Sequence, residues 1–147
     1  MKGFAIRQPW AWAIFSPPEG LRKDIENREW QPTNPGLRFR GRCVILATAH
    51  PGDSKWFDRW SEFCETVLAM PGDTDDACNR IPDSTSLVFG ALIGTVEIVD
   101  VVTAHSSPWF FGPYGLVLRE PRPFKNPIPY KGALGFFDVP DRILPHA

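Results

Sequence analysis

Lysine, glutamate and arginine occur together in one short stretch, KDIENREW, which runs from Lys23 to Trp30. Side chains two apart in a strand share a face, so Glu26 and Arg28 are expected on one side and Ile25 on the other. Arginine presents a planar fork that suits phosphate or carbonyl oxygens, and lysine adds a compact charge. The stretch therefore predicts an anion-binding site formed by Lys23 and Arg28.

Glu26 has two opposed interpretations. A carboxylate beside two cations has a lowered pKa, so it stays ionised at neutral pH and can accept a hydrogen bond from a base. It acts as a general base only where its surroundings raise that pKa. Alternatively, Glu26 and Arg28 form a solvated ion pair that contributes under about 1 kcal/mol. In either case the charged side of the strand is expected to lie outside the core.

Aromatic residues that could contribute to such a site occur in two further segments. QPW, from Gln8 to Trp10, stands where a strand is expected to give way to a short helix, so a base could stack on the ring and bond the amide. Trp12 is about 200° further around such a helix, so one of the two tryptophans is expected in the core. SSPWFFGPYG, at 106–115, is expected either to close one side of a cleft or to plug the end of a barrel, with its rings Trp109, Phe110 and Tyr114.

The sequence gives little support to metal or serine-nucleophile chemistry. The three histidines and three cysteines lack metal-ligand spacing, so no metal site and no disulfide framework are expected; they are His50, His105, His146, Cys43, Cys64 and Cys78. The serine pair at 106–107 follows His105 but lacks a G-x-S-x-G context. We therefore expect no metal and no cofactor.

The hydrophobic pattern predicts a β-rich scaffold for these residues. Apolar residues recur at three- and four-residue steps between Trp56 and Leu68, which predicts one main amphipathic helix over about 51–70. A shorter helix is expected at 10–15, because Pro9 suits a first turn and Pro17 ends it. Strands are expected at 3–7, 24–30, 43–47, 91–102, 114–120 and 134–140. Five or six strands with one main helix predict a mixed α+β fold built on a small curled sheet or β-barrel.

The 147 residues fit a single domain, 1–147, that can bury a core without disulfide or metal. No stretch approaches about eighteen apolar residues and no secretory signal is apparent, so a cytoplasmic protein that does not enter a membrane is expected. Residues 1–42 carry eight Lys/Arg against four Asp/Glu, whereas 43–100 carry three against ten. This asymmetry predicts a basic face or, alternatively, an ordinary mixed surface. The acidic, turn-prone segment 73–86 is expected to form a surface loop.

Six sequence blocks occur in the same order as in a known family. They are IRQPWAWAI, KDIENREW, RGRCVILA, GALIGTVEIVD, GPYGLVLREP and KGALGFF. In these blocks, and across nearly its whole length, the chain resembles the activating signal cointegrator homology (ASCH) domain. The resemblance implies a PUA-like β-barrel whose shared residues surround a cleft for RNA or a nucleotide. The residues that it points to are Gln8, Pro9, Trp10, Lys23, Glu26, Arg28, Tyr114 and Lys131.

The chain departs from the family pattern at two positions. Many relatives have a histidine where this chain has Leu46, so a role that depends on that imidazole is absent here. One small branch removes acyl groups from N4-acetylcytidine and carries threonine where this chain has Glu26. The mechanism of that branch therefore does not transfer directly.

Three functions follow as hypotheses. The leading one is a protein that binds single-stranded RNA, a nucleotide or a modified nucleoside in the cleft. The second is a metal-independent hydrolase, either a ribonuclease or a nucleoside amidohydrolase, with Lys23 as electrostatic stabiliser and Glu26 as base. The third is a coregulator-like interaction module that binds a protein partner through the acidic loop 73–86.

Overall fold

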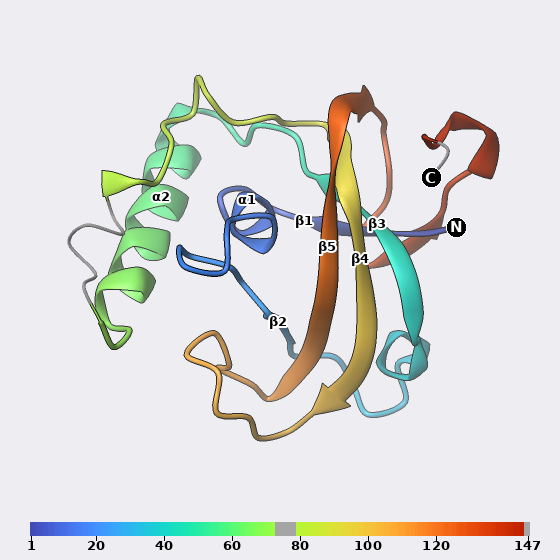
Figure 1. The fold of residues 1–147 in the computed structure, drawn as a ribbon, viewed down its shortest axis with the longest axis horizontal. Coiled ribbons are helices and arrows are strands. Elements are labelled where there is room, and N and C mark those ends of the chain that lie inside the picture. Colours follow the sequence, from blue (N-terminus) through green and yellow to red (C-terminus); the bar gives the residue numbers. More distant parts are fainter. Residues whose placement is uncertain (73–78, 146–147) are drawn as a thin grey trace.

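The computed structural model describes residues 1–72 and 79–145. Within these ranges, six strands form one curled sheet, and two α-helices lie to one side of it (Figure 1). The elements in chain order are β1 (Lys2–Ile6), α1 (Trp10–Ile14), β2 (Ile25–Arg28), β3 (Gly41–Ala47), α2 (Asp53–Leu68), β4 (Ala91–Val102), β5 (Tyr114–Pro129) and β6 (Phe136–Asp138), with 3₁₀ turns at Pro35–Arg38 and Asp141–Ile143. The expected mixed α+β fold with six strands, one main helix and a short helix after β1 is confirmed.

The sheet has the order β2-β5-β4-β3-β1-β6. β1 and β3 pair in parallel, and the other neighbours are antiparallel. β2 and β1 lie near opposite ends of this order, yet Arg28 Nη2 of β2 donates to the backbone oxygen of Ala5 in β1 at 3.2 Å. The sheet is therefore curled far enough for a side chain of its first strand, β2, to reach the strand next to its other end.

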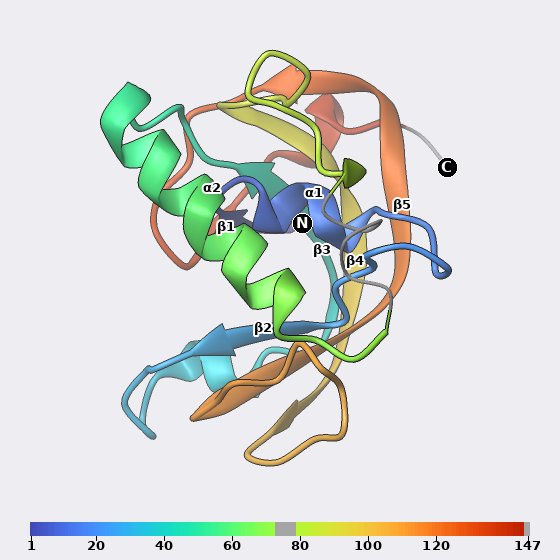
Figure 2. The same cartoon turned by 90° about the vertical axis from the view of Figure 1, so that its left-hand side faces the viewer.

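The core fills the inside of this curl. Alternate residues of the strands point inward and meet α1, whose Ala11 and Ile14 are fully buried among them. Figure 2 views the molecule from the side of α2 and shows that helix lying across α1. α2 is anchored there by Phe63 and Val67, which are both fully buried, in a cluster that also contains Ala13. Within the described ranges, no helix is both long and apolar enough to cross a membrane.

The expectation that one of the two tryptophans of α1 lies in the core is wrong. Trp10 and Trp12 are both half-buried, and each ring meets Phe63 of α2 edge-on, with centroids 5.4 and 6.5 Å away.

The expected end of β5 at Glu120 is also wrong. β5 continues nine residues past Glu120 to Pro129, and this added part pairs with the first half of β4. β2 pairs only with the start of β5, so the rest of β5 has one edge unpaired in the sheet, where proline is tolerated.

The expected acidic loop 73–86 is described only in part. Residues 73–78, which include Cys78, lie outside the described residues, and so does His146. In the described remainder, Asp83 caps a turn, since its Oδ1 accepts from the Thr85 and Ser86 amides at 3.1 and 3.2 Å. Ile81 is buried against the cluster under α2. The described end of this segment is therefore partly packed onto the domain.

Candidate ligand-binding cleft

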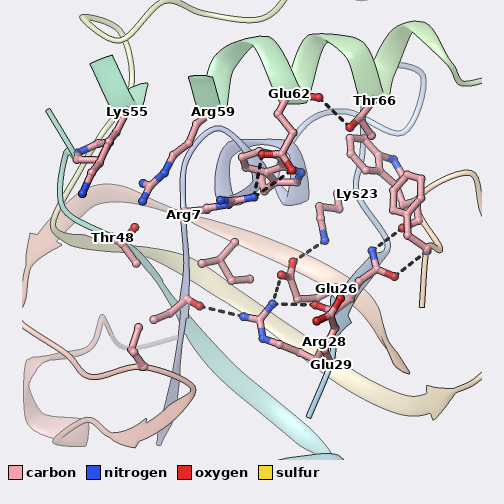
Figure 3. A pocket seen from close by; sticks show the side chains of 18 of the residues that line it. Arg7, Lys23, Glu26, Arg28, Glu29, Thr48, Lys55, Arg59, Glu62 and Thr66 are labelled. Carbon is pink, nitrogen blue, oxygen red and sulfur yellow. Dashed lines mark hydrogen bonds and ion pairs between the residues drawn. The ribbon is translucent and has the colours of Figure 1, made fainter. Parts of the chain in front are cut away.

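A cleft of about 1000 Å³ opens between α2 on one side and β1 and β2 on the other (Figure 3). Its wall also includes Thr48 after β3 and the 109–112 loop that precedes β5. This volume is at the upper end of the range for small-molecule sites. The cleft contains three of the residues singled out from the KDIENREW stretch, namely Lys23, Glu26 and Arg28.

These three side chains form one ionic cluster, in which Lys23 and Glu26 are buried and Arg28 is half-buried. The ammonium of Lys23 lies 2.5 Å from Glu26 Oε2 and also donates to the backbone oxygen of Ile25. Arg28 donates to the other oxygen, Glu26 Oε1, and reaches Ala5 with its second nitrogen. Lys23 is only 2% exposed and Glu26 only 7%. The carboxylate of Glu26 is thus held from both sides by cations that come from the same stretch.

The ionisation of the cluster follows from burial and charge together. Burial alone would raise the pKa of Glu26, but attraction to Lys23 and Arg28, with their hydrogen bonds, outweighs it and holds the pKa below its ordinary value. Burial lowers the pKa of Lys23, the Glu26 charge opposes that change, and Arg28 adds to it. Two cations share one carboxylate, so the cluster keeps one positive charge in excess.

The interpretation of Glu26 and Arg28 as a solvated ion pair is wrong, and so is the expectation that the charged side of β2 lies outside the core. The carboxylate of Glu26 is buried because each of its oxygens has a cationic partner, which compensates the cost of removing it from water. Lys23 and Arg28 are also engaged with backbone oxygens. Both cations therefore serve first to hold Glu26 and the backbone around it.

The QPW block is placed beside the cleft, with Gln8 beneath its wall. Gln8 is 2% exposed, and both ends of its amide are hydrogen-bonded: Nε2 donates to the Val88 oxygen at 2.9 Å and Oε1 accepts from the Trp12 amide at 2.8 Å. Trp10 lines the cleft, but the guanidinium of Arg7 lies over its ring, 4.3 Å from the centroid. Gln8 therefore orders the start of α1, and one face of Trp10 is already covered.

Two further residues expected at the site do not line the cleft. Tyr114 is half-buried and pairs with Arg28 in the ladder between β2 and β5. Lys131 is exposed, in the segment between β5 and β6. The structure thus brings together Trp10, Lys23, Glu26 and Arg28, and it leaves Gln8, Tyr114 and Lys131 outside the cleft lining.

The 109–112 loop is held by one side chain of β2. Asn27 Nδ2 donates to the Trp109 oxygen at 2.8 Å, and its Oδ1 accepts from the amides of Phe111 and Gly112 at 2.8 and 3.0 Å. Trp109 is buried against Phe63 under α2, as expected for a plug. Phe111 lines the cleft with 62% of its surface exposed. Both expectations for this segment thus describe part of it, but the rings that line the cleft are Trp109 and Phe111, and the expected Phe110 and Tyr114 do not line it.

Ser107 has a structural role in the same segment. Its hydroxyl donates to Asp24 Oδ1 at 2.5 Å and accepts from the Trp109 amide at 3.1 Å, while its own amide donates to His105 Nδ1 at 2.9 Å. These bonds shape the turn that leads into the loop. Among residues 1–72 and 79–145, no group of three or more His, Cys, Asp or Glu is placed to hold a metal ion.

Several cleft residues were not singled out from the sequence. Those that matter below are Arg7, Asn27, Thr48, Lys55, Arg59, Glu62 and Phe111. A signal for two of them was present: Lys55 and Arg59 are four residues apart on α2, beside its apolar stripe, so they share one helix face. Residues 43–100 have a net negative charge, so the charge count along the chain did not point to this basic pair.

A search against family models found no match, and a search of curated proteins found no match either. The function of the chain is therefore inferred from the cleft itself and from the sequence blocks that resemble the ASCH domain. The structure contributes three observations to that inference: the curled sheet, the cleft beside it, and the buried ionic cluster in its wall.

Proposed function

We propose that this chain is an ASCH-type, PUA-like protein that binds single-stranded RNA or a nucleotide in the cleft. The observation that carries the proposal is the composition of the cleft wall, where five Lys/Arg side chains face three Glu and an exposed aromatic ring stands at the rim. A phosphate-bearing chain needs cations along its path, and unpaired bases need flat surfaces on which to stack.

Phe111 is the ring that suits base stacking best. It is largely exposed, although large apolar side chains gain free energy from burial, and Asn27 fixes the backbone on which it stands. The guanidinium of Arg7 offers a second flat surface above Trp10. Phe111 and Arg7 line the same cleft, so each offers a surface on which a base can stack.

A hydrolase is the second candidate, favoured by one observation. Lys23 and Glu26 touch in the wall of the cleft, where burial strengthens their electrostatic effect on a bound group. However, the lowered pKa of Glu26 makes it a weak proton acceptor at neutral pH. Binding without turnover is therefore the primary proposal.

The third candidate, a module that captures a protein through the acidic loop 73–86, gains no support because residues 73–78 lie outside the described residues.

The experiment that tests the proposal is incubation of the protein with short RNA oligonucleotides, nucleotides and modified nucleosides, followed by mass spectrometry of retained and converted species. We expect unconverted RNA or nucleotide to be retained. Phe111→Ala should weaken that binding by about 1–3 kcal/mol with little change in melting temperature. Cleaved RNA or a free acid would instead establish the hydrolase.

The matched aromatic control is Trp10→Ala, because Trp10 packs against Phe63 and carries Arg7. This variant should lose stability, whereas Phe111→Ala should not. If no member of the panel is retained, or if Phe111→Ala binds as tightly as the parent protein, the proposal is wrong.

A further inference from the structure

α2 turns a polar stripe toward the cleft (Figure 3). Its members lie three or four residues apart on one helix face and are Lys55, Arg59, Glu62 and Thr66. Two of them are engaged: Glu62 Oε2 lies 3.2 Å from Arg7 Nη2, and Thr66 Oγ1 donates to the Glu62 backbone oxygen at 2.8 Å. For the other two, Lys55 and Arg59, the described part of the chain offers no carboxylate oxygen within 4.0 Å.

The remaining cations of the cleft already have anionic partners. Lys23 and Arg28 share Glu26, and Arg7 is paired with Glu62. The two cleft cations with no carboxylate partner in the described part of the chain therefore lie at the end of the cleft beside the first two turns of α2. The ionic cluster lies at the opposite end in Figure 3.

The free protein keeps like charges close together at this end. Burial lowers the pKa of Arg59, repulsion from Arg7 lowers it further, and Glu62 only partly opposes the change. Thr48 also lines the cleft here and adds a hydroxyl group opposite Lys55 (Figure 3). A bound anion would relieve the repulsion and accept hydrogen bonds from all these groups.

We propose that Lys55 and Arg59, assisted by Arg7 and Thr48, form a phosphate subsite at the α2 end of the cleft. The inference rests on the proposed function and adds that the ligand carries phosphate, so a neutral nucleoside is a poor ligand. Arg59 binds phosphate oxygens with its fork, and Lys55 supplies a point charge beside it. The phosphate belongs either to a free nucleotide or to the backbone of an RNA strand.

The first test compares Lys55→Ala/Arg59→Ala with Lys125→Ala/Arg142→Ala, which removes two exposed cations that do not line the cleft. The probes are a short oligouridine RNA, uridine monophosphate and uridine. For the cleft variant, Lys55→Ala/Arg59→Ala, we expect RNA affinity to fall at least about tenfold. The slope of log affinity against log salt concentration should become shallower by about 1.4. The control variant should keep both. Equal RNA affinity and slope in the cleft variant would overturn the subsite, as would equal affinity of the parent protein for uridine and its monophosphate.

The second test uses inorganic pyrophosphate, so it does not depend on nucleic-acid binding. In NMR spectra, pyrophosphate should shift the side-chain Nε–H resonance of Arg59 in the parent protein and in the control variant. Absence of this shift would overturn the subsite even if RNA binds. If pyrophosphate shifts Arg59 but no RNA or nucleotide binds at all, the subsite stands and the proposed function fails. Preference for the monophosphate over the RNA would identify a free nucleotide as the source of the phosphate, and the reverse would identify an RNA strand.

Discussion

Glu26 is a carboxylate removed from water and placed between two cations, Lys23 and Arg28. Such an arrangement stabilises a fold only as a complete set, because removal of one partner leaves uncompensated charge in a buried place. Arg28 also contacts the rings of Phe4 and Trp30, with its guanidinium 4.6 and 5.6 Å from their centroids. The cluster is therefore part of the packing as well as part of the cleft wall.

The first prediction concerns Glu26→Gln, which keeps the size of the side chain and removes its charge. The buried Lys23 and the half-buried Arg28 would then lack their anion, so we expect the free energy of unfolding to fall by about 3–5 kcal/mol. The matched control is Glu62→Gln in the exposed pair with Arg7, where the expected loss is under about 1 kcal/mol. Chemical denaturation measures both. A loss for Glu26→Gln no larger than that of the control would contradict the account of the cluster.

A second prediction concerns the pH dependence of stability. The folded pKa of Glu26 is held below its ordinary value of 4.5, so the unfolded chain takes up this proton at a higher pH than the folded chain does. Its contribution to stability is fully present above the ordinary value and is lost as pH falls through the folded pKa. Denaturation curves measured from neutral pH downward should show a steeper loss in the parent protein than in Glu26→Gln. Parallel curves would show that the Glu26 carboxyl is not perturbed.

At the scale of elements, β2 and the 109–112 loop act together. One face of β2 carries the ionic cluster, and its Asn27 holds the loop that presents Phe111. The loop has no strand pairing of its own, so these side-chain bonds decide its position. A change at Asn27 should therefore be felt at Phe111 without unfolding the domain.

The third prediction is that Asn27→Ala loosens the 109–112 loop. The amides of Phe111 and Gly112 would lose their acceptor, so their hydrogen exchange should accelerate, and affinity for RNA should fall as in Phe111→Ala. Asn34→Ala is the matched control, since Asn34 Oδ1 likewise accepts a backbone amide, that of Gly36 at 2.8 Å, in a separate turn. Unchanged exchange at Phe111 in Asn27→Ala would mean that the loop holds its shape by other contacts.

Sequence patterns placed most elements correctly because their hydrophobic period is local. β4 has the bounds expected from the sequence, β1 begins and ends one residue earlier than expected, and α1 ends one residue earlier than expected. β5 was predicted too short because Pro121 and Pro123 follow Glu120, and proline lacks the amide hydrogen that a strand paired on both sides needs. Only the strand order shows that this part of β5 has a free edge, and strand order is not a local property.

The candidate site was predictable only in part, for a related reason. Lys23, Glu26 and Arg28 are neighbours in sequence, so their grouping could be anticipated from spacing. Their burial could not, because it depends on α2 and the curl of the sheet. Lys55 and Arg59 join the cleft from a distant helix, and only the packing of α2 across α1 brings them there.

For the whole molecule, the curl of the sheet is what creates the cleft. Arg28 joins β2, at one end of the strand order, to β1, next to the other end, and α2 stands above that junction. The basic residues around the cleft come from β2, from the segment just before it, from the segment after β1 and from α2. Local net charge along the chain is therefore a poor guide to the charge of the folded surface.

The fourth prediction tests most directly the central claim that the cleft is the binding site for RNA or a nucleotide. Hydrogen–deuterium exchange should be measured by mass spectrometry with and without saturating oligouridine RNA. We expect RNA to slow exchange in 108–113 and 48–60, which contain the 109–112 loop and the first turns of α2. Exchange in 119–126, which contains no residue of the cleft lining, should not change. Protection confined to 119–126, or no protection anywhere at saturating RNA, would contradict the account.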